Sequence, residues 1–239
     1  MGLLALAVAP GIAICLFIYA KDKYNKEPLW LILVSFILGA LSIVPALISE
    51  VGFTDLLKMY MVENTPAYIA VFSFGVVACS EELSKFLVVR FFCFRRKAFD
   101  DPFDGIVYSV IVSMGFATLE NIGYVYEHGI AVGVTRMFLS VPAHATFGVL
   151  MGYHVGLAKF NTAKRGRYLL MGLLWAIVFH GTFDFFLFLS NNLLHLAGAL
   201  GSFIVAIYLS RRAIRKKQAI SKQYLDGLDV ISNNDNSLL

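Results

Sequence analysis

Residues 30–49 read WLILVSFILGALSIVPALIS, a run of 20 residues without a charged side chain. A helix of about 20 apolar residues is long enough to cross the hydrocarbon core of a bilayer. Apolar runs of this kind recur along the chain, which is typical of a membrane protein and not of a soluble domain. We therefore predict an all-α, polytopic transmembrane helix bundle with about seven spans. The predicted spans are 2–20, 30–49, 67–90, 103–126, 137–157, 168–189 and 193–210.

The composition favours the same class. Of the 239 residues, 59% are hydrophobic and only 15% are charged, too few to cover the surface of a soluble domain. The net charge is +4, but most basic residues lie in short segments between apolar runs, so we expect no nucleic acid partner. The three cysteines lack C-x-x-C spacing and predict neither a disulfide framework nor a zinc site.

The connecting segments differ in basic charge in a regular way. In chain order they carry three, one, four, one, four, zero and six Lys or Arg residues, and Lys85, inside a span, completes the total of 20. Because basic residues gather in cytoplasmic loops, this alternation predicts an N-terminus outside the cell and a C-terminus in the cytoplasm. We expect residues 1–210 to form one transmembrane domain. Residues 211–239 are basic and then polar, and we expect a disordered cytoplasmic tail.

Several polar residues lie inside the predicted spans, where a charge is costly and usually functional. Lys85 follows Glu81 by four residues and Glu82 by three, so it can pair with either carboxylate. One glutamate would be enough to neutralise the lysine, which suggests another role for the second. His180 and Asp184 are also four residues apart. The full set is Glu81, Glu82, Lys85, Glu120, Asn121, His144, His180 and Asp184.

The expected depth of these residues in the bilayer places them close to one another. At about 1.5 Å per residue, Glu81 falls near the middle of the bilayer. The residues that fall in its outer half are Glu120, His144, His180 and Asp184. Isolated charges at that depth would each carry their own energetic penalty. A shared, water-accessible cavity formed by four helices is therefore expected.

A row of small residues runs along the fifth predicted span. His144, Gly148, Gly152 and Gly156 follow one another at steps of four and predict a ridge against which another helix packs closely. His154 lies about 80° away from this ridge, and we assign it to packing.

The cluster is suited to hydrolysis by an activated water. A buried glutamate can act as a general base near neutral pH. A histidine, or a protonated aspartic acid, can donate hydrogen bonds to the oxyanion of a tetrahedral intermediate. The sequence has neither an H-E-x-x-H motif nor a serine in a G-x-S-x-G elbow.

Four motifs follow one another along the chain. They are Glu81-Glu82-x-x-Lys85, Phe116-x-x-x-Glu120-Asn121, His144-Ala-x-x-Gly148 and His180-x-x-x-Asp184. Together they resemble the motif series of the PrsW family of glutamic-type intramembrane proteases, and Asp104–Tyr108 and Met151-Gly152 also match the pattern of that family. The resemblance covers most of the chain, from about residue 10 to the sixth span.

The resemblance implies a multi-pass peptide hydrolase of the bacterial cell membrane, related to CAAX prenyl endopeptidases and bacterial immunity proteases. It also implies a substrate. The family makes the site-1 cut in a single-span anti-sigma factor, and further proteolysis then releases an extracytoplasmic-function sigma factor in a stress response. The lipid bilayer and such a substrate are the expected partners.

The resemblance also suggests roles. Glu81 is expected to be the water-activating base, with Glu82 and Lys85 as positioning residues. His180, together with Asp184 or with His144, is expected to stabilise the oxyanion.

Two positions depart from the related CAAX enzymes. Those enzymes have a histidine where this chain has Glu120, and an asparagine where it has Asp184. Asp184 can replace the asparagine as a donor only if it is protonated, and otherwise it orients His180.

Three alternatives stay open. We expect no cofactor, although His144, His180 and a glutamate would also make a zinc-binding set. A non-catalytic scaffold, similar to a seven-span subunit of γ-secretase, is less favoured because that subunit lacks the paired glutamates. A proton-coupled transporter is the least favoured, because the sequence has no inverted repeat.

Overall fold

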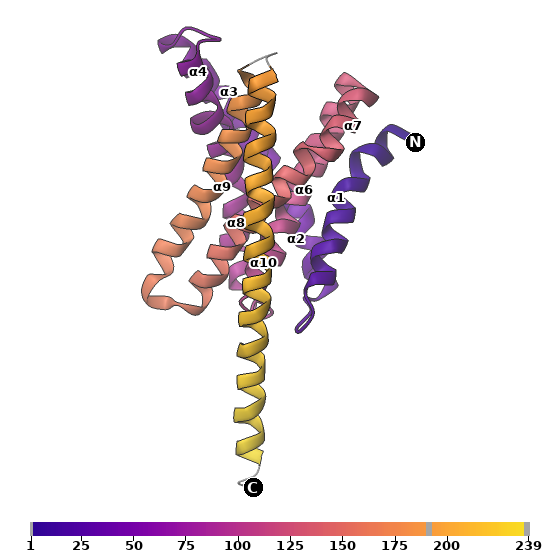
Figure 1. The fold of residues 1–239 in the computed structure, drawn as a ribbon, viewed down its shortest axis with the longest axis vertical. Coiled ribbons are helices and arrows are strands. Elements are labelled where there is room, and N and C mark those ends of the chain that lie inside the picture. Colours follow the sequence, from indigo (N-terminus) through magenta and orange to yellow (C-terminus); the bar gives the residue numbers. More distant parts are fainter. Residues whose placement is uncertain (1, 190–192, 237–239) are drawn as a thin grey trace.

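The computed structural model describes residues 2–189 and 193–236, and no strand occurs within these ranges. Figure 1 shows the helices side by side in one bundle. The α-helices are α1 (Gly2–Lys21), α2 (Leu29–Leu41), α3 (Ile43–Tyr60), α4 (Pro66–Val71), α5 (Cys79–Phe91), α6 (Asp104–His128), α7 (Ile130–Phe138), α8 (Ser140–Phe160), α9 (Arg165–Phe188) and α10 (Leu193–Asn236).

Six helical stretches of the described chain are long and apolar enough to cross a membrane. The expected span at 67–90 is continuous helix as well, but it is divided between α4, a π-helical segment (Phe72–Ala78) and α5. The all-α, multi-span prediction is thus confirmed. The stretches are Gly2–Lys21, Leu29–Tyr60, Asp104–His128, Ile130–Phe160, Thr162–Phe188 and Leu193–Tyr224.

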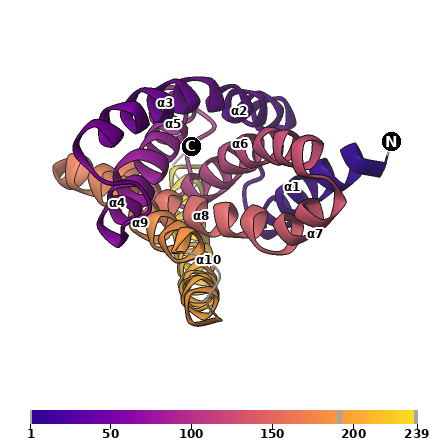
Figure 2. The same cartoon turned by 90° about the horizontal axis from the view of Figure 1, so that it is seen from above.

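Helix α6 is the central element of the bundle. It packs against α1, α2 and α8, and the view from above shows it between α2 and α8 (Figure 2). Most of its residues are buried, although it has the composition of a membrane span. Most side chains of α6 up to Thr118 therefore face protein and not lipid.

The glycine ridge of α8 explains how close α6 can come. A Cβ on Gly152 would lie 2.3 Å from the carbonyl oxygen of Gly105 at the start of α6, and one on Gly148 would lie 2.9 Å from Oγ of Ser113. Only a residue without a side chain fits at Gly152. The predicted close helix–helix contact is confirmed.

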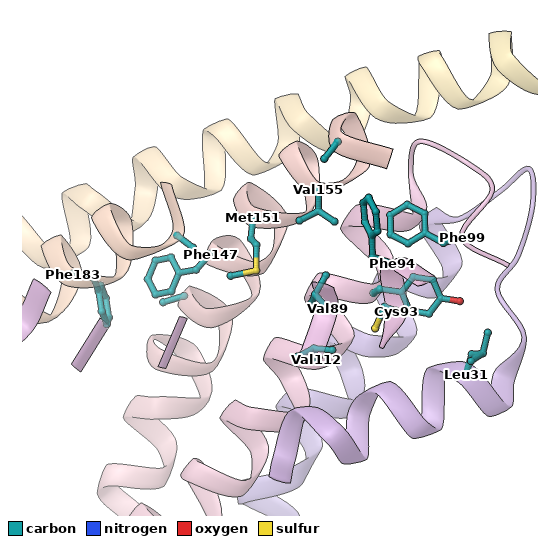
Figure 3. Close-up of a cluster of buried hydrophobic side chains, with 14 of the residues drawn as sticks. Leu31, Val89, Cys93, Phe94, Phe99, Val112, Phe147, Met151, Val155 and Phe183 are labelled. Carbon is teal, nitrogen blue, oxygen red and sulfur yellow. The ribbon is translucent and has the colours of Figure 1, made fainter. Parts of the chain in front are cut away.

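A hydrophobic cluster fixes α5 and the following loop against α6 and α8. Val89, Phe94 and Phe99 pack with Met151 and Val155 (Figure 3). Burial of one such side chain contributes roughly 1.5–3 kcal/mol. Phe147 and Phe183 belong to the same cluster, which brings the apolar core directly to the polar residues described below.

Helix α10 does not end where the predicted domain ends. It continues through residues 211–236 and projects beyond the bundle (Figure 1), where we expected a disordered tail. Lys217 and Ser221 are buried against the bundle, and Ser221 donates a hydrogen bond to Asp101. The segment 211–222 contains no glycine or proline, so nothing in its sequence breaks the helix that the apolar span begins.

Candidate active site

The paired glutamates lie just after an irregular stretch of helix. The π-helical segment Phe72–Ala78 leads into α5, and Glu81 and Glu82 belong to the first turn of that helix. π-helical turns are rare and occur frequently at functional sites. Nζ of Lys85 lies 3.0 Å from Oε2 of Glu81 and 2.8 Å from Oε1 of Glu82. The lysine therefore pairs with both carboxylates at once.

His144 connects this lysine to Glu120. Its Nδ1 lies 3.2 Å from Nζ of Lys85, and its Nε2 lies 3.0 Å from Oε2 of Glu120. An ammonium group can only donate, so Nδ1 accepts and Nε2–H donates to the carboxylate. This network fixes one neutral tautomer of His144.

Arg136 is a functional candidate that the sequence analysis missed. It was counted as a loop charge, yet it lies in α7 with Nη2 2.8 Å from Oε2 of Glu120. Its Nε donates to Oδ1 of Asn121 at 3.1 Å, and Asn121 also donates to the carbonyl of Ala7 at 2.9 Å. A lone arginine in an otherwise apolar stretch was the signal that could have revealed a buried partner.

His180 lies between carboxylates on two helices. Its Nδ1 is 2.8 Å from Oε1 of Glu82, and its Nε2 is 3.1 Å from Oδ2 of Asp184 and 4.0 Å from Oε2 of Glu81. Both ring nitrogens face acceptors, which suits the doubly protonated imidazolium. The ring stacks on Phe147 with a centroid distance of 4.9 Å and an interplanar angle of 16°. The imidazole is thus held on three sides.

A cavity of about 300 Å³ opens onto this network. Glu82 and Lys85 do not line it and are wholly buried behind it, with 0% and 1% of their surface exposed. Glu50, on α3, reaches the cavity and was not among the predicted site residues. The polar residues that line the cavity are Glu50, Glu81, Glu120, Tyr124, Arg136, Ser140, His144, His180 and Asp184.

Positive and negative groups alternate throughout this cluster. Glu82 contacts Lys85 and His180, and Glu120 contacts Arg136 and His144. A buried charge without such a partner would cost several kcal/mol. The pairing offsets this cost beside a small cavity, and a carboxylate that faces such a cavity can take a proton from water.

The cluster also contains the chemistry of a metal site. One donor atom from each of Glu81, Glu82, His144 and His180 lies within 4.8 Å of the others. Two imidazoles and two carboxylates suit Zn²⁺. However, the Lys85 ammonium already contacts three of these four residues, so a dication there would meet a fixed positive charge. The donor types fit a metal, whereas the position of Lys85 favours an arrangement without one.

The predicted site residues are brought together from α5, α6, α8 and α9. Asn121 lies one contact away and supports Arg136. His154 lies outside the cluster and lines a different hollow.

Comparison with known proteins identifies the family of the chain. The family described as "PrsW family intramembrane metalloprotease" matches residues 27–210. The chain is 38% identical to the Protease PrsW of Geobacillus kaustophilus over 218 residues, which cover 91% of this chain and 92% of the relative. It is 35% identical to the Protease PrsW of Bacillus subtilis over 191 residues, 80% of this chain and 84% of the relative. It is 37% identical to that of Clostridioides difficile over 194 residues, 78% and 79% of the two chains. No solved structure matches the chain.

Proposed function

Because this chain belongs to the PrsW family of intramembrane proteases of bacterial membranes, we propose that its cavity makes the site-1 cut in a single-span anti-sigma factor. That cut would lead to release of an extracytoplasmic-function sigma factor. The observation that carries the proposal is the position of Glu81, whose carboxylate faces the cavity beside His180 and Asp184.

Glu81 is the proposed general base. Its Oε2 accepts from Lys85, and no described residue donates to its Oε1, which leaves an oxygen for a water molecule. The water oxygen attacks the peptide carbonyl carbon as Glu81 takes one of its protons. The same proton then passes to the leaving amine as the carbon–nitrogen bond breaks. A positioned base of this kind contributes about 10²–10⁴-fold in rate.

Histidine N–H groups are the proposed oxyanion donors. His180 lines the cavity, and its Nδ1–H is held by Glu82 while its Nε2–H points to Asp184. The oxyanion would therefore replace the Asp184 carboxylate as the acceptor of Nε2–H when substrate binds. Preorganised donors of this type are worth about 10²–10³-fold in kcat. His144 is the second proposed donor, and its Nε2–H would have to shift from Glu120 to the oxyanion. Glu82 and Lys85 act as positioning residues behind the cavity.

The location of the cavity supports a cut near one membrane surface. His144 lies four residues from the first residue of α8, and Asp184 lies four residues before the last residue of α9. Both helix ends are remote from the segments rich in Lys and Arg, which belong on the cytoplasmic side. A single-span substrate would therefore be cut in its extracytoplasmic half.

A zinc-dependent variant is the second candidate, supported by the family description and by the four donor residues. When bound, Zn²⁺ would polarise a carbonyl and acidify a bound water. Elemental analysis of the purified protein distinguishes the metal-free mechanism from the zinc-dependent one. We expect less than about 0.1 zinc per chain and unchanged cleavage in chelator, because Lys85 occupies the donor set. Stoichiometric zinc that His180→Ala removes would establish the metal variant.

Reconstituted protein and single-span substrates test the proposal. Glu81→Gln, Glu82→Gln and His180→Ala are compared with Glu127→Gln, an exposed carboxylate on α6 that serves as the matched control. We expect cleavage of an anti-sigma factor by wild type and by the control only. If all three site variants cleave normally, the protease mechanism is wrong. If wild type cleaves only single-span proteins unrelated to sigma-factor control, the substrate assignment is wrong.

A further inference from the structure

A second hollow of about 320 Å³ lies between α8, α9 and α10. Its volume is in the range of ligand-binding pockets, about 300–1,000 Å³. It includes His154 of α8, which is ten residues and about 15 Å along the helix from His144 of the cleavage site. The two hollows are therefore separate.

One end of this hollow is basic. Arg212 and Lys216 lie one turn apart on α10, and neither makes an ion pair with a described residue. No carboxylate among the described residues lines the hollow, and the ammonium of Lys216 lies 5.7 Å from the ring centre of Tyr153. Two cations without counter-ions beside a hollow indicate an anionic ligand.

The apolar part of the lining includes Leu150, Phe179 and Leu209, and Trp175 lines the hollow as well. Arg212 is 19 residues after the first residue of α10, which corresponds to about 28 Å of helix. The hydrocarbon core of a bilayer is about 30 Å thick. The basic end therefore lies at the depth of the lipid headgroups, and the apolar part of the lining at the depth of the acyl chains.

We propose that this hollow binds one anionic phospholipid. Its phosphate lies between Arg212 and Lys216, and the upper part of an acyl chain lies along Leu150 and Phe179. Basic pockets between transmembrane helices bind acidic lipid headgroups for the same electrostatic reason. The lipid links α10 to α8 and α9, the helices that carry His144 and His180. Its binding does not depend on the proposed cleavage reaction.

Tryptophan fluorescence gives a direct test, because the chain has only two tryptophans. In a Trp30→Phe background, emission comes from Trp175, which lines the hollow. The full chain is reconstituted with phosphatidylcholine that contains increasing fractions of either brominated phosphatidylglycerol or brominated phosphatidylcholine. We expect the anionic lipid to quench Trp175 at a mole fraction at least about ten-fold lower.

Charge substitutions locate the effect. Arg212→Gln with Lys216→Gln should abolish the difference between the two lipids. Arg215→Gln with Lys222→Gln removes the same charge from exposed positions of α10 that do not line the hollow, and should preserve it. Equal quenching by both lipids in wild type, or equal loss in both double variants, would overturn the proposal. Displacement of the brominated lipid by glycerol phosphate alone would also overturn it, because the site would then bind a phosphate and not a lipid.

Discussion

Two buried acidic clusters lie at opposite ends of α6, and they are built differently. The site cluster, around Glu81, Glu82 and Glu120, pairs its carboxylates with Lys85, with Arg136 and with histidines. The second, which we call the loop cluster, consists of acidic residues from the loops 22–28 and 96–103 and from the start of α6. Its members are Asp22, Glu27, Asp101 and Asp104.

The loop cluster is held by neutral donors. Oδ2 of Asp104 accepts from the backbone N–H groups of Asp100 and Asp101 at 2.9 and 2.7 Å. Tyr108 donates to Glu27, and Ser221 donates to Asp101. None of the loop-cluster carboxyls forms an ion pair with a described residue. These acids therefore connect two loops to α6 and α10.

The two clusters differ in the charge of their surroundings, and this difference suggests a catalytic role for one and a structural role for the other. Burial raises the pKa of Asp22 and of Glu27 to about 7 in each case, so these acids are largely uncharged below neutral pH and about half ionised at it. The site cluster instead surrounds its acids with cations and faces a cavity. We infer that the site cluster pairs its carboxylates with cations because one of them must activate water. The loop cluster needs only hydrogen bonds that hold the loops in place, and protonated carboxyls can form these.

The largest expected effect comes from making the same substitution in each cluster. Glu81→Gln removes the proposed base and should lower kcat by about 10²–10⁴-fold. Glu27→Gln keeps the size and hydrogen-bonding capacity of its side chain and should change kcat by less than about three-fold. Cleavage of a reconstituted single-span substrate measures both. A loss of activity in Glu27→Gln comparable to that in Glu81→Gln would contradict the claim that only the site cluster takes part in catalysis.

Removal of a cation should damage only the site cluster. Lys85→Met leaves Glu81 and part of Glu82 without their counter-ion, and should lower the free energy of unfolding by about 3–5 kcal/mol. The double variant Glu82→Gln/Lys85→Met should recover part of that loss, because it removes one of the unpaired charges. Unfolding in mild detergent, followed by circular dichroism, gives both values. Equal unfolding free energies for Lys85→Met and wild type would show that the ion pairs of Lys85 do not stabilise the fold.

The loop cluster should make stability depend on pH. Asp22 and Glu27 bind protons more tightly in the folded state than in the unfolded chain, where their pKa values are about 4. Their contribution is full below pH 4 and is lost as pH rises through 7, so the unfolding free energy should fall between pH 5 and pH 8. Glu27→Gln should reduce the total fall in unfolding free energy between pH 5 and pH 8 by on the order of 2 kcal/mol. A variant slope equal to that of wild type would contradict the role of Glu27.

The smallest effect is expected at Asn121. Asn121→Ala removes the acceptor of Arg136 Nε and the donor to Ala7, which should cost about 1–3 kcal/mol of stability. Arg136 keeps its contact with Glu120, so kcat should fall by less than about ten-fold. Measurement of kcat and of the unfolding midpoint in the same preparation tests this prediction. A loss of activity as large as that of Glu81→Gln would show that Asn121 takes part in catalysis.

Helical periodicity explains what could be predicted from the sequence. The spacing of Glu81, Glu82 and Lys85, and that of His180 and Asp184, gave contacts within one helix that the structure reproduces. The glycine row of α8 gave the close approach to another helix, although not the identity of that helix.

Contacts between helices were harder to predict. The Arg136–Glu120 pair depends on the way α7 returns toward α6. Gly129, with a φ of 81°, marks the turn between these helices, but a glycine does not give the direction in which α7 returns. Glu50 lies at the end of an apolar run that continues as helix to Tyr60, so it resembled a residue at the membrane surface. The extension of α10 was missed because its basic, polar composition suits both a free tail and a helix that packs through one face.

Cleavage in H₂¹⁸O tests most directly the claim that water activated by Glu81 hydrolyses a peptide bond in this cavity. Purified wild type, reconstituted with a single-span anti-sigma factor, should release a fragment whose new carboxyl terminus contains one ¹⁸O atom, as measured by mass spectrometry. Glu81→Gln, folded to the same unfolding midpoint, should release essentially none. Production of the labelled fragment by Glu81→Gln at the wild-type rate would contradict the account.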